Sequence, residues 1–162
     1  MTRITPGLAA ALTLISPSFA AADSFTPPNG PIQFEGDMVL SQSGVSLPPC
    51  LVAMHLSFHG TGALVLDARA TGVFCVNWTF PNPPWGIEVV TPSGPPGEPA
   101  TRLRLWNIRA QFYAPCFGDV LVDWNAGPPA TITFPPGTTL PGGCGLSGVM
   151  EQVDGPPLTI TK

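Results

Sequence analysis

The fold class is decided by residues 115–125, Pro-Cys-Phe-Gly-Asp-Val-Leu-Val-Asp-Trp-Asn. Apolar and polar side chains alternate along most of this stretch, and the two-residue period is typical of a strand with one buried face. One face of the strand carries Val120, Val122 and Trp124, and the opposite face carries Asp119, Leu121 and Asp123. We therefore expect a strand whose two valines and tryptophan enter a core.

The residues that follow complete a strand–turn–strand unit. Residues 125–129, Asn-Ala-Gly-Pro-Pro, have turn chemistry, and residues 131–134, Thr-Ile-Thr-Phe, suit a return strand. A second hairpin is predicted from the alternation over residues 51–59 and 64–69, on either side of a Gly-Thr-Gly turn. The whole chain shows about nine or ten such short strands, and no long segment has a helical period free of Pro and Gly. The sequence predicts an all-β fold, an antiparallel β-sandwich or barrel.

Three finer expectations concern the core. The second hairpin places Leu64, Leu66 and Ala68 on one face of its return strand. Gly36 lies inside an earlier strand, where we expect it to form a bulge. All or most of the tryptophans are expected to be buried. The tryptophans are Trp78, Trp85, Trp106 and Trp124.

Residues 1–22 are predicted to be a secretory signal peptide, which leaves residues 23–162 as a single exported β-domain. Arg3 precedes a short apolar run, and small residues suit cleavage after Ala20 or Ala22. No later apolar run approaches the roughly 20 residues that a membrane-spanning helix needs, so we expect no integral membrane span. The protein is therefore expected to be secreted or on the cell surface, and at least periplasmic.

The composition excludes some classes of partner. Loss of the leader would leave five basic residues against ten acidic residues, and Lys162 is the single lysine. With no basic patch, the domain is not expected to bind nucleic acid or an anionic membrane by charge. Gly and Pro are frequent, with 18 and 22 residues, but the 44% apolar content argues for a packed domain.

The chain has an even number of cysteines, which in an exported protein favours two disulfides. Three pairings are possible. We favour Cys50 with Cys75 and Cys116 with Cys144, because each pair brackets a strand–turn–strand unit of similar length. A metal site is disfavoured, because no two cysteines have the short Cys-x-x-Cys spacing.

Candidates for catalysis are few. His55 and His59 share a strand face but lie about 13 Å apart, too far to bind one metal ion. Ser57, His59 and Asp67 could be imagined as a triad, but no nucleophile elbow accompanies them. Asp119 and Asp123 have the same wide spacing as the histidines, beyond the glycosidase range. We predict that the protein is not an enzyme and has no catalytic residues, metal or cofactor.

The sequence resembles the Pra family of small exported bacterial proteins, named as protein activators of alkane oxidation. The resemblance spans roughly residues 36–150 and rests on three segments. These are Phe74-Cys75 with Asn82-Pro83-Pro84-Trp85, Cys116 to Asn125, and Gly143-Cys144-Gly145-Leu146-Ser147-Gly148. Two departures are Pro83, where the family has Leu, and Phe117, which separates the cysteine from the glycine.

The resemblance implies a surface-active protein that promotes contact with hydrocarbons or emulsifies them, with no catalytic residues to carry over. Contact with an apolar substrate requires exposed apolar surface, and proline-rich loops with aromatic residues at their edges could supply it. Candidates for this contact are Phe25, Phe80, Trp85 and Phe112. The alternative function is a cell-surface or biofilm-matrix structural protein that self-associates through strand edges.

Overall fold

The computed structural model describes residues 23–27, 29–59, 62–91 and 96–162. The expected signal peptide, residues 1–22, lies outside the described residues. The secondary structure over the described ranges is twelve strands. No helix in these ranges is long and apolar enough to cross a membrane.

The strands differ widely in length, from two residues to fourteen. Their bounds, in chain order, are β1 (Ser24–Thr26), β2 (Asn29–Gln42), β3 (Val45–Ser46), β4 (Cys50–His59), β5 (Gly62–Thr71), β6 (Trp85–Thr91), β7 (Arg102–Gln111), β8 (Pro115–Asn125), β9 (Thr131–Phe134), β10 (Thr139–Leu140), β11 (Cys144–Asp154) and β12 (Thr159–Thr161).

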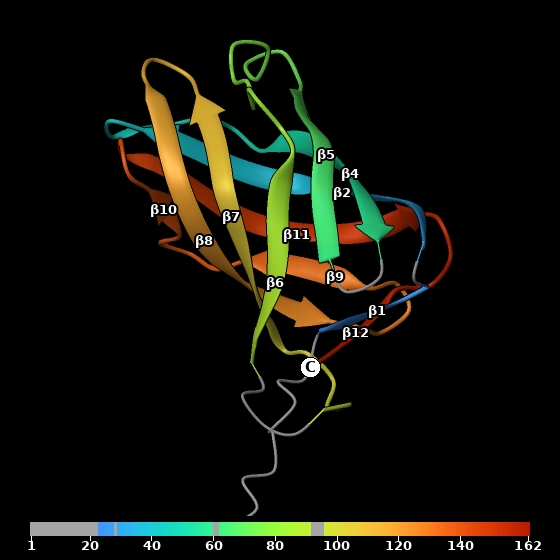
Figure 1. Ribbon diagram of the computed structural model, residues 1–162. Helices are drawn as coiled ribbons and strands as arrows, with labels where there is room; N and C mark the ends of the chain where they lie inside the picture. The colour runs from blue at the N-terminus through green and yellow to red at the C-terminus, as the bar shows by residue number, and fades with distance from the viewer. Residues whose placement is uncertain (1–22, 28, 60–61, 92–95) are drawn as a thin grey trace, which may run out of the picture.

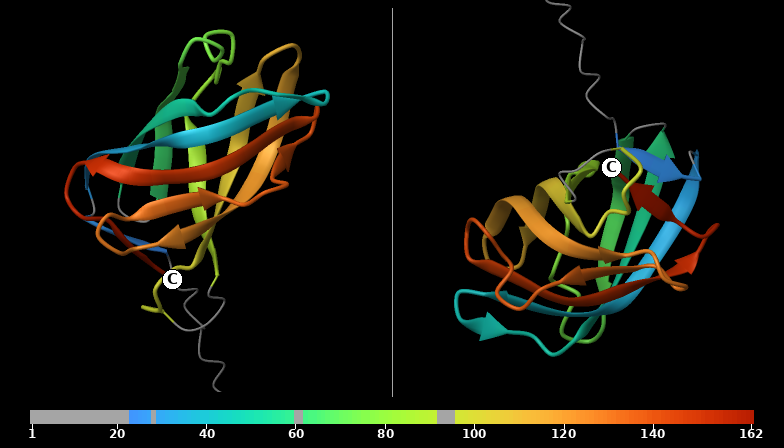
Figure 2. Two further views of the ribbon diagram at one scale, coloured as in Figure 1. Left: turned by 180° about the vertical axis from the view of Figure 1, so that it is seen from behind. Right: turned by 90° about the horizontal axis from the view of Figure 1, so that it is seen from below.

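Eight antiparallel strands form a closed barrel (Figures 1 and 2). They follow the order β2-β4-β5-β6-β7-β8-β9-β11, and β11 pairs with β2 to close the ring. The short strands β3 and β10 extend β2 and β11, and β1 pairs with β12 beside the C-terminus. The predicted all-β class is confirmed, and the architecture is the barrel.

The strand that decided the fold class behaves as predicted. Val120, Val122 and Trp124 of β8 are at most 5% exposed, and the residues between them face solvent. The inside of the barrel is filled by apolar side chains from all eight strands. Burial of this kind contributes about 25 cal/mol for each Å² of apolar surface removed from water.

Three of the four tryptophans are buried, and Trp106 is the exception at 42% exposure. It stands opposite Gly86 in the β6–β7 ladder, on the outside of the barrel. A Cβ atom on Gly86 would lie 1.9 Å from the Trp106 ring, so the indole covers the backbone of the glycine. Trp106 therefore packs on the outer wall, over a position where a side chain is missing.

The predicted facing of the second hairpin is wrong. Ala63, Val65 and Ala68 are buried in β5, and Leu66 is 48% exposed. The cause is a bulge: His55 pairs with Asp67, but its neighbour Leu56 pairs with Val65, so Leu66 has no partner in β4. The extra residue reverses the inward and outward positions along the rest of the strand.

Gly36 is not a bulge, contrary to expectation. The register between β2 and β4 is continuous from Asn29 to Met38. The glycine is needed instead because β11 approaches closely, and a Cβ atom there would lie 1.9 Å from the carbonyl oxygen of Val149. Gly36 thus allows the barrel to close between β2 and β11.

Two disulfides have the predicted pairing, Cys50–Cys75 and Cys116–Cys144. All four cysteines are at most 2% exposed. Both bridges lie at the same end of the barrel, opposite the end that carries β1, β12 and the C-terminus. Two structural disulfides are typical of proteins in an oxidising compartment, outside the cytoplasm.

Candidate functional site

The residues considered for a catalytic triad do not assemble. The Ser57 hydroxyl lies 3.5 Å from Nδ1 of His59, but Asp67 is directed elsewhere. Its carboxylate lies 3.8 Å from Nδ1 of His55 and 3.0 Å from Nε of Arg69. An acid–base relay through His59 therefore lacks its carboxylate.

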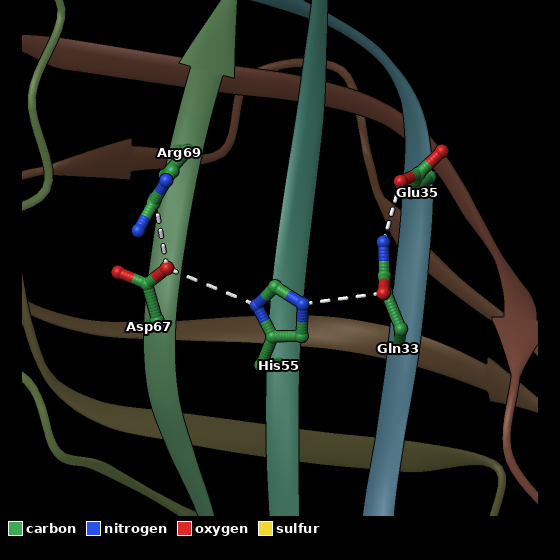
Figure 3. Close-up of polar contacts among 5 residues, drawn as sticks. All are labelled: Gln33, Glu35, His55, Asp67 and Arg69. Atoms are coloured by element: carbon green, nitrogen blue, oxygen red, sulfur yellow. Dashed lines mark hydrogen bonds and ion pairs between the residues drawn. The ribbon is translucent and has the colours of Figure 1, made fainter.

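Asp67 belongs instead to a row of polar side chains across β2, β4 and β5 (Figure 3). The other ring nitrogen of His55 lies 3.2 Å from the Gln33 side-chain oxygen, and Gln33 donates to Glu35 over 2.5 Å. The side chains of His55 and Asp67 are 45% and 40% exposed. Contacts of this kind on an open sheet face contribute little individually, about 0.2–1 kcal/mol.

The remaining acidic candidates also have structural partners. Asp119 accepts a hydrogen bond from the backbone N–H of Asn107 at 3.0 Å, and Asp123 pairs with Arg102 at 3.6 Å. Over the residues that the structure describes, no three His, Cys, Asp or Glu side chains are grouped so that they could hold a metal ion. These carboxylates stabilise the outer wall and are not arranged as a reactive pair.

The end of the barrel that holds both bridges has a different character. We call it the disulfide end and define it by four segments of strand ends and loops. The segments are residues 39–51, 70–87, 110–118 and 135–150. None of the chain's Asp, Glu, Lys, Arg or His residues lies in these segments. All the charges of the domain are therefore on the barrel wall and at the opposite end.

A turn after β5 brings exposed apolar side chains to the disulfide end. Cys75 is buried in its bridge, and its backbone N–H donates to the carbonyl oxygen of Gly72 at 3.0 Å. The neighbours of Cys75 in this turn, Phe74 and Val76, are 64% and 68% exposed. Val73 is 85% exposed, so three large apolar residues stand on one bridged turn.

The neighbouring β7–β8 hairpin adds an aromatic residue to this surface. Thr79 and Gln111 exchange two backbone hydrogen bonds of 2.9 Å, which join the chain after the turn to the hairpin. Phe112 stacks on the buried ring of Trp78 with 5.7 Å between centroids, and Tyr113 beside it is 66% exposed. The two loops lie side by side at the top of Figure 1.

Gln42 holds the hairpin in place from below. It is fully buried, its side-chain oxygen accepts from the backbone N–H of Tyr113 at 2.8 Å and of Ala114 at 3.2 Å, and its amide donates to the Ala114 carbonyl at 2.7 Å. A buried side-chain amide that accepts from the N–H groups of a hairpin and donates to one of its carbonyls fixes the position of the hairpin. We call Val73, Phe74, Val76 and Tyr113 the apolar rim.

The structure places the four predicted contact residues differently from the apolar rim. Phe25 and Trp85 are each 2% exposed and cannot offer contact surface in this fold. Phe25 packs against Phe58 with 5.5 Å between centroids, and Trp85 meets Phe80 edge-on at 5.7 Å. Phe80 and Phe112 are half-buried and support the rim from beneath.

The residues of the apolar rim were missed by sequence reasoning. Residues 73–77 form a turn, with backbone hydrogen bonds from Cys75 to Gly72 and from Trp78 to Cys75, so the two-residue period of a strand does not apply to them. The exposure of all four rim residues depends on loop conformation, which the sequence pattern does not encode.

Comparison with known proteins gives one match. A family model described as "Alkane oxidation protein activator PraA/PraB-like" matches residues 1–161. Searches of curated proteins and of solved structures found no significant match. The description names an activator and not an enzyme. With the match covering the chain from residue 1 to residue 161, the protein belongs to the PraA/PraB-like family of alkane oxidation protein activators.

Proposed function

We propose that this protein is exported and acts without catalysis, by placing its disulfide end against hydrophobic substrate. The observation that carries the proposal is the uncharged end of the barrel with the apolar rim exposed on it. The family description supplies the chemical context, since alkanes offer no polar group to recognise. Promoting contact with such a substrate, or emulsifying it, requires an apolar surface rather than acid–base groups.

The energetics favour adsorption at this end and oppose it on the wall. Full burial of a large apolar side chain contributes roughly 1.5–3 kcal/mol, and the rim holds four such residues that are 64–85% exposed. An end without charged residues also avoids the large free-energy cost of removing an ion from water. The charged wall would remain in water while the disulfide end faces the oil, so the barrel would be oriented at the interface like a surfactant molecule.

The disulfide end is built to keep its fold while it is in contact with oil. Two bridges and the buried Gln42 side chain tie its loops to the barrel. A flexible loop would lose conformational entropy on adsorption, and a pre-ordered one loses less. We infer that the same bridges reflect folding in an oxidising compartment after export, which supports a secreted or cell-surface protein.

A pendant-drop measurement of hexadecane–water interfacial tension tests the proposal. The wild-type domain is expected to lower the tension, and the variant Val73→Ser/Phe74→Ser/Val76→Ser is expected to lose most of that effect. The matched control is Leu66→Ser/Leu121→Ser/Val153→Ser, which removes three wall residues that are 40–54% exposed. Equal loss of activity in both variants would contradict an effect located at the disulfide end.

The alternative function, self-association through strand edges, has less support in the fold. Barrel closure by the β2–β11 pairing uses the edges that an open sheet would present. The strands outside the ring, β1, β3, β10 and β12, are two or three residues long. Growth of filaments with protein concentration, unaffected by the rim substitutions, would favour this alternative.

A further inference from the structure

We propose that a groove beside the disulfide end binds the carboxylate of a single-chain amphiphile through Arg109. The inference rests on the proposed function and deepens it, since it names a substrate class for the same end of the barrel. It follows from the distribution of ion pairs on the wall and from the shape of the surface where the wall meets the uncharged end.

Arg109 differs from the other basic side chains that the structure describes. Each of the other four has a carboxylate partner within 4.0 Å. The pairs are Arg69 with Asp67, Arg102 with Asp123, Arg104 with Glu88 and Lys162 with Asp23. Within the described ranges, Arg109 has no such partner, and its guanidinium lies over the Phe117 ring at 5.0 Å.

The nearest acidic residue along β8 is already engaged. Asp119 lies two residues beyond Phe117, which is the partner of Arg109 in the β7–β8 ladder. The Asp119 carboxylate accepts the backbone N–H of Asn107 and is not within ion-pair distance of the guanidinium. The positive charge of Arg109 is therefore available to an anion from solution.

Arg109 lines a groove of about 310 Å³. The other lining residues include Pro81 and Pro115, which are apolar, and Asn82 and Gln111, whose side chains carry amides. The volume is at the lower limit of known ligand pockets and suits a headgroup with the first part of an alkyl chain. Planar Arg binds carboxylate with two parallel hydrogen bonds, and the amides can donate to an oxygen that remains free.

The position of the groove orients the ligand. Arg109 is one residue outside the uncharged segment 110–118, so a carboxylate held there leaves its chain beside the disulfide end. An amphiphile in this orientation would continue the apolar surface of the rim. A neutral alcohol of equal length would gain the apolar contacts and lose the charge-assisted hydrogen bonds.

Titration calorimetry at pH 8, below the micelle concentration of the ligand, tests the site with three probes: decanoate, decanol and acetate. Decanoate is expected to bind wild-type protein about tenfold or more tightly than decanol or acetate do. Arg109→Gln should reduce decanoate affinity by a similar factor, and Arg109→Lys should retain part of it. Arg69→Gln is the matched control, because that side chain is 75% exposed and paired with Asp67 on the wall.

Equal decanoate affinity of the wild type and Arg109→Gln would overturn the proposal, and so would decanol or acetate binding as tightly as decanoate. The hexadecane tension measurement separates this result from the proposed function. Arg109→Gln keeps the apolar rim, so we expect it to lower the tension as the wild type does. Loss of carboxylate binding with unchanged tension would support the site.

Discussion

The disulfide end and the polar wall of the barrel use opposite means to remain ordered. At the disulfide end, two bridges and a buried glutamine hold loops that expose large apolar residues. On the wall, ladders of backbone hydrogen bonds hold the strands together. The contacts among the side chains of His55, Asp67 and Arg69 add little to stability. The end can thus expose residues that would normally form a core, because covalent bonds and buried polar contacts replace the packing those residues would provide.

Stability and function depend on different residues in the two regions. A residue of the apolar rim is expected to matter for contact with oil and little for folding, since its side chain touches mostly solvent. A cysteine or Gln42 beneath the rim is expected to matter for both. Substitutions on the wall should affect neither strongly.

The largest effect is expected from removal of a bridge. Cys50→Ala/Cys75→Ala and Cys116→Ala/Cys144→Ala each open a loop of similar length, with separations of 25 and 28 residues. On the chain-entropy model each should lower the free energy of unfolding by about 3.5 kcal/mol, measured by urea denaturation. The two variants should differ in hexadecane tension, because Cys75 carries Phe74 and Val76 and the second bridge carries no rim residue.

A smaller effect is expected from replacing either of two glutamines, one at each end of the barrel, whose side chains hydrogen-bond to the backbone of a nearby turn. Gln42 is fully buried, and Gln152 at the opposite end accepts from the Leu158 N–H at 3.2 Å and donates to the Pro156 carbonyl at 2.7 Å. Gln42→Leu leaves three part-buried backbone groups of the hairpin without this partner and should cost about 2–3 kcal/mol in urea unfolding. Gln152→Leu should cost about 1 kcal/mol or less, because only the Leu158 contact is part-buried and its contacts to Gly155 and Pro156 are exposed.

A larger loss of unfolding free energy in Gln152→Leu than in Gln42→Leu would contradict this expectation. In that event the turn at the terminal end would be the more tightly organised region. Hydrogen exchange of the Tyr113 and Leu158 amides offers an independent check. Tyr113 should lose more protection in Gln42→Leu than Leu158 loses in Gln152→Leu.

Much of the architecture was predictable because it depends on short-range pattern. Alternation in residues 120–124 predicted the inward face of β8, and the similar spacing of the cysteines within each pair predicted the correct bridges. The facing of β5 was not predictable, because one bulged residue, Leu66, reverses the pattern without a glycine or proline to mark it. Bulges depend on how two strands meet, which a single strand's sequence does not contain.

The candidate site was less accessible to sequence reasoning than the fold. Trp85 follows a proline and Phe25 lies two residues before one, so both resemble loop residues. Trp85 instead begins the barrel strand β6, and Phe25 lies in β1, which pairs with β12. The absence of charge at the disulfide end could be read only when the barrel had brought together four segments that are distant in the chain. Surface character of this kind is a property of topology.

The smallest effect is expected from the polar row on the wall. Asp67→Asn removes the ion pair with Arg69 and weakens the contact with His55, both of which are exposed to solvent. Water and salt screen such pairs, so the free energy of unfolding should fall by about 0.5 kcal/mol or less, and hexadecane tension should not change. Because the asparagine keeps the size and shape of the side chain, the variant tests charge alone. A loss of several kcal/mol would show that the row, rather than the strand ladders, holds β4 against β5, and the contrast between wall and disulfide end would then fail.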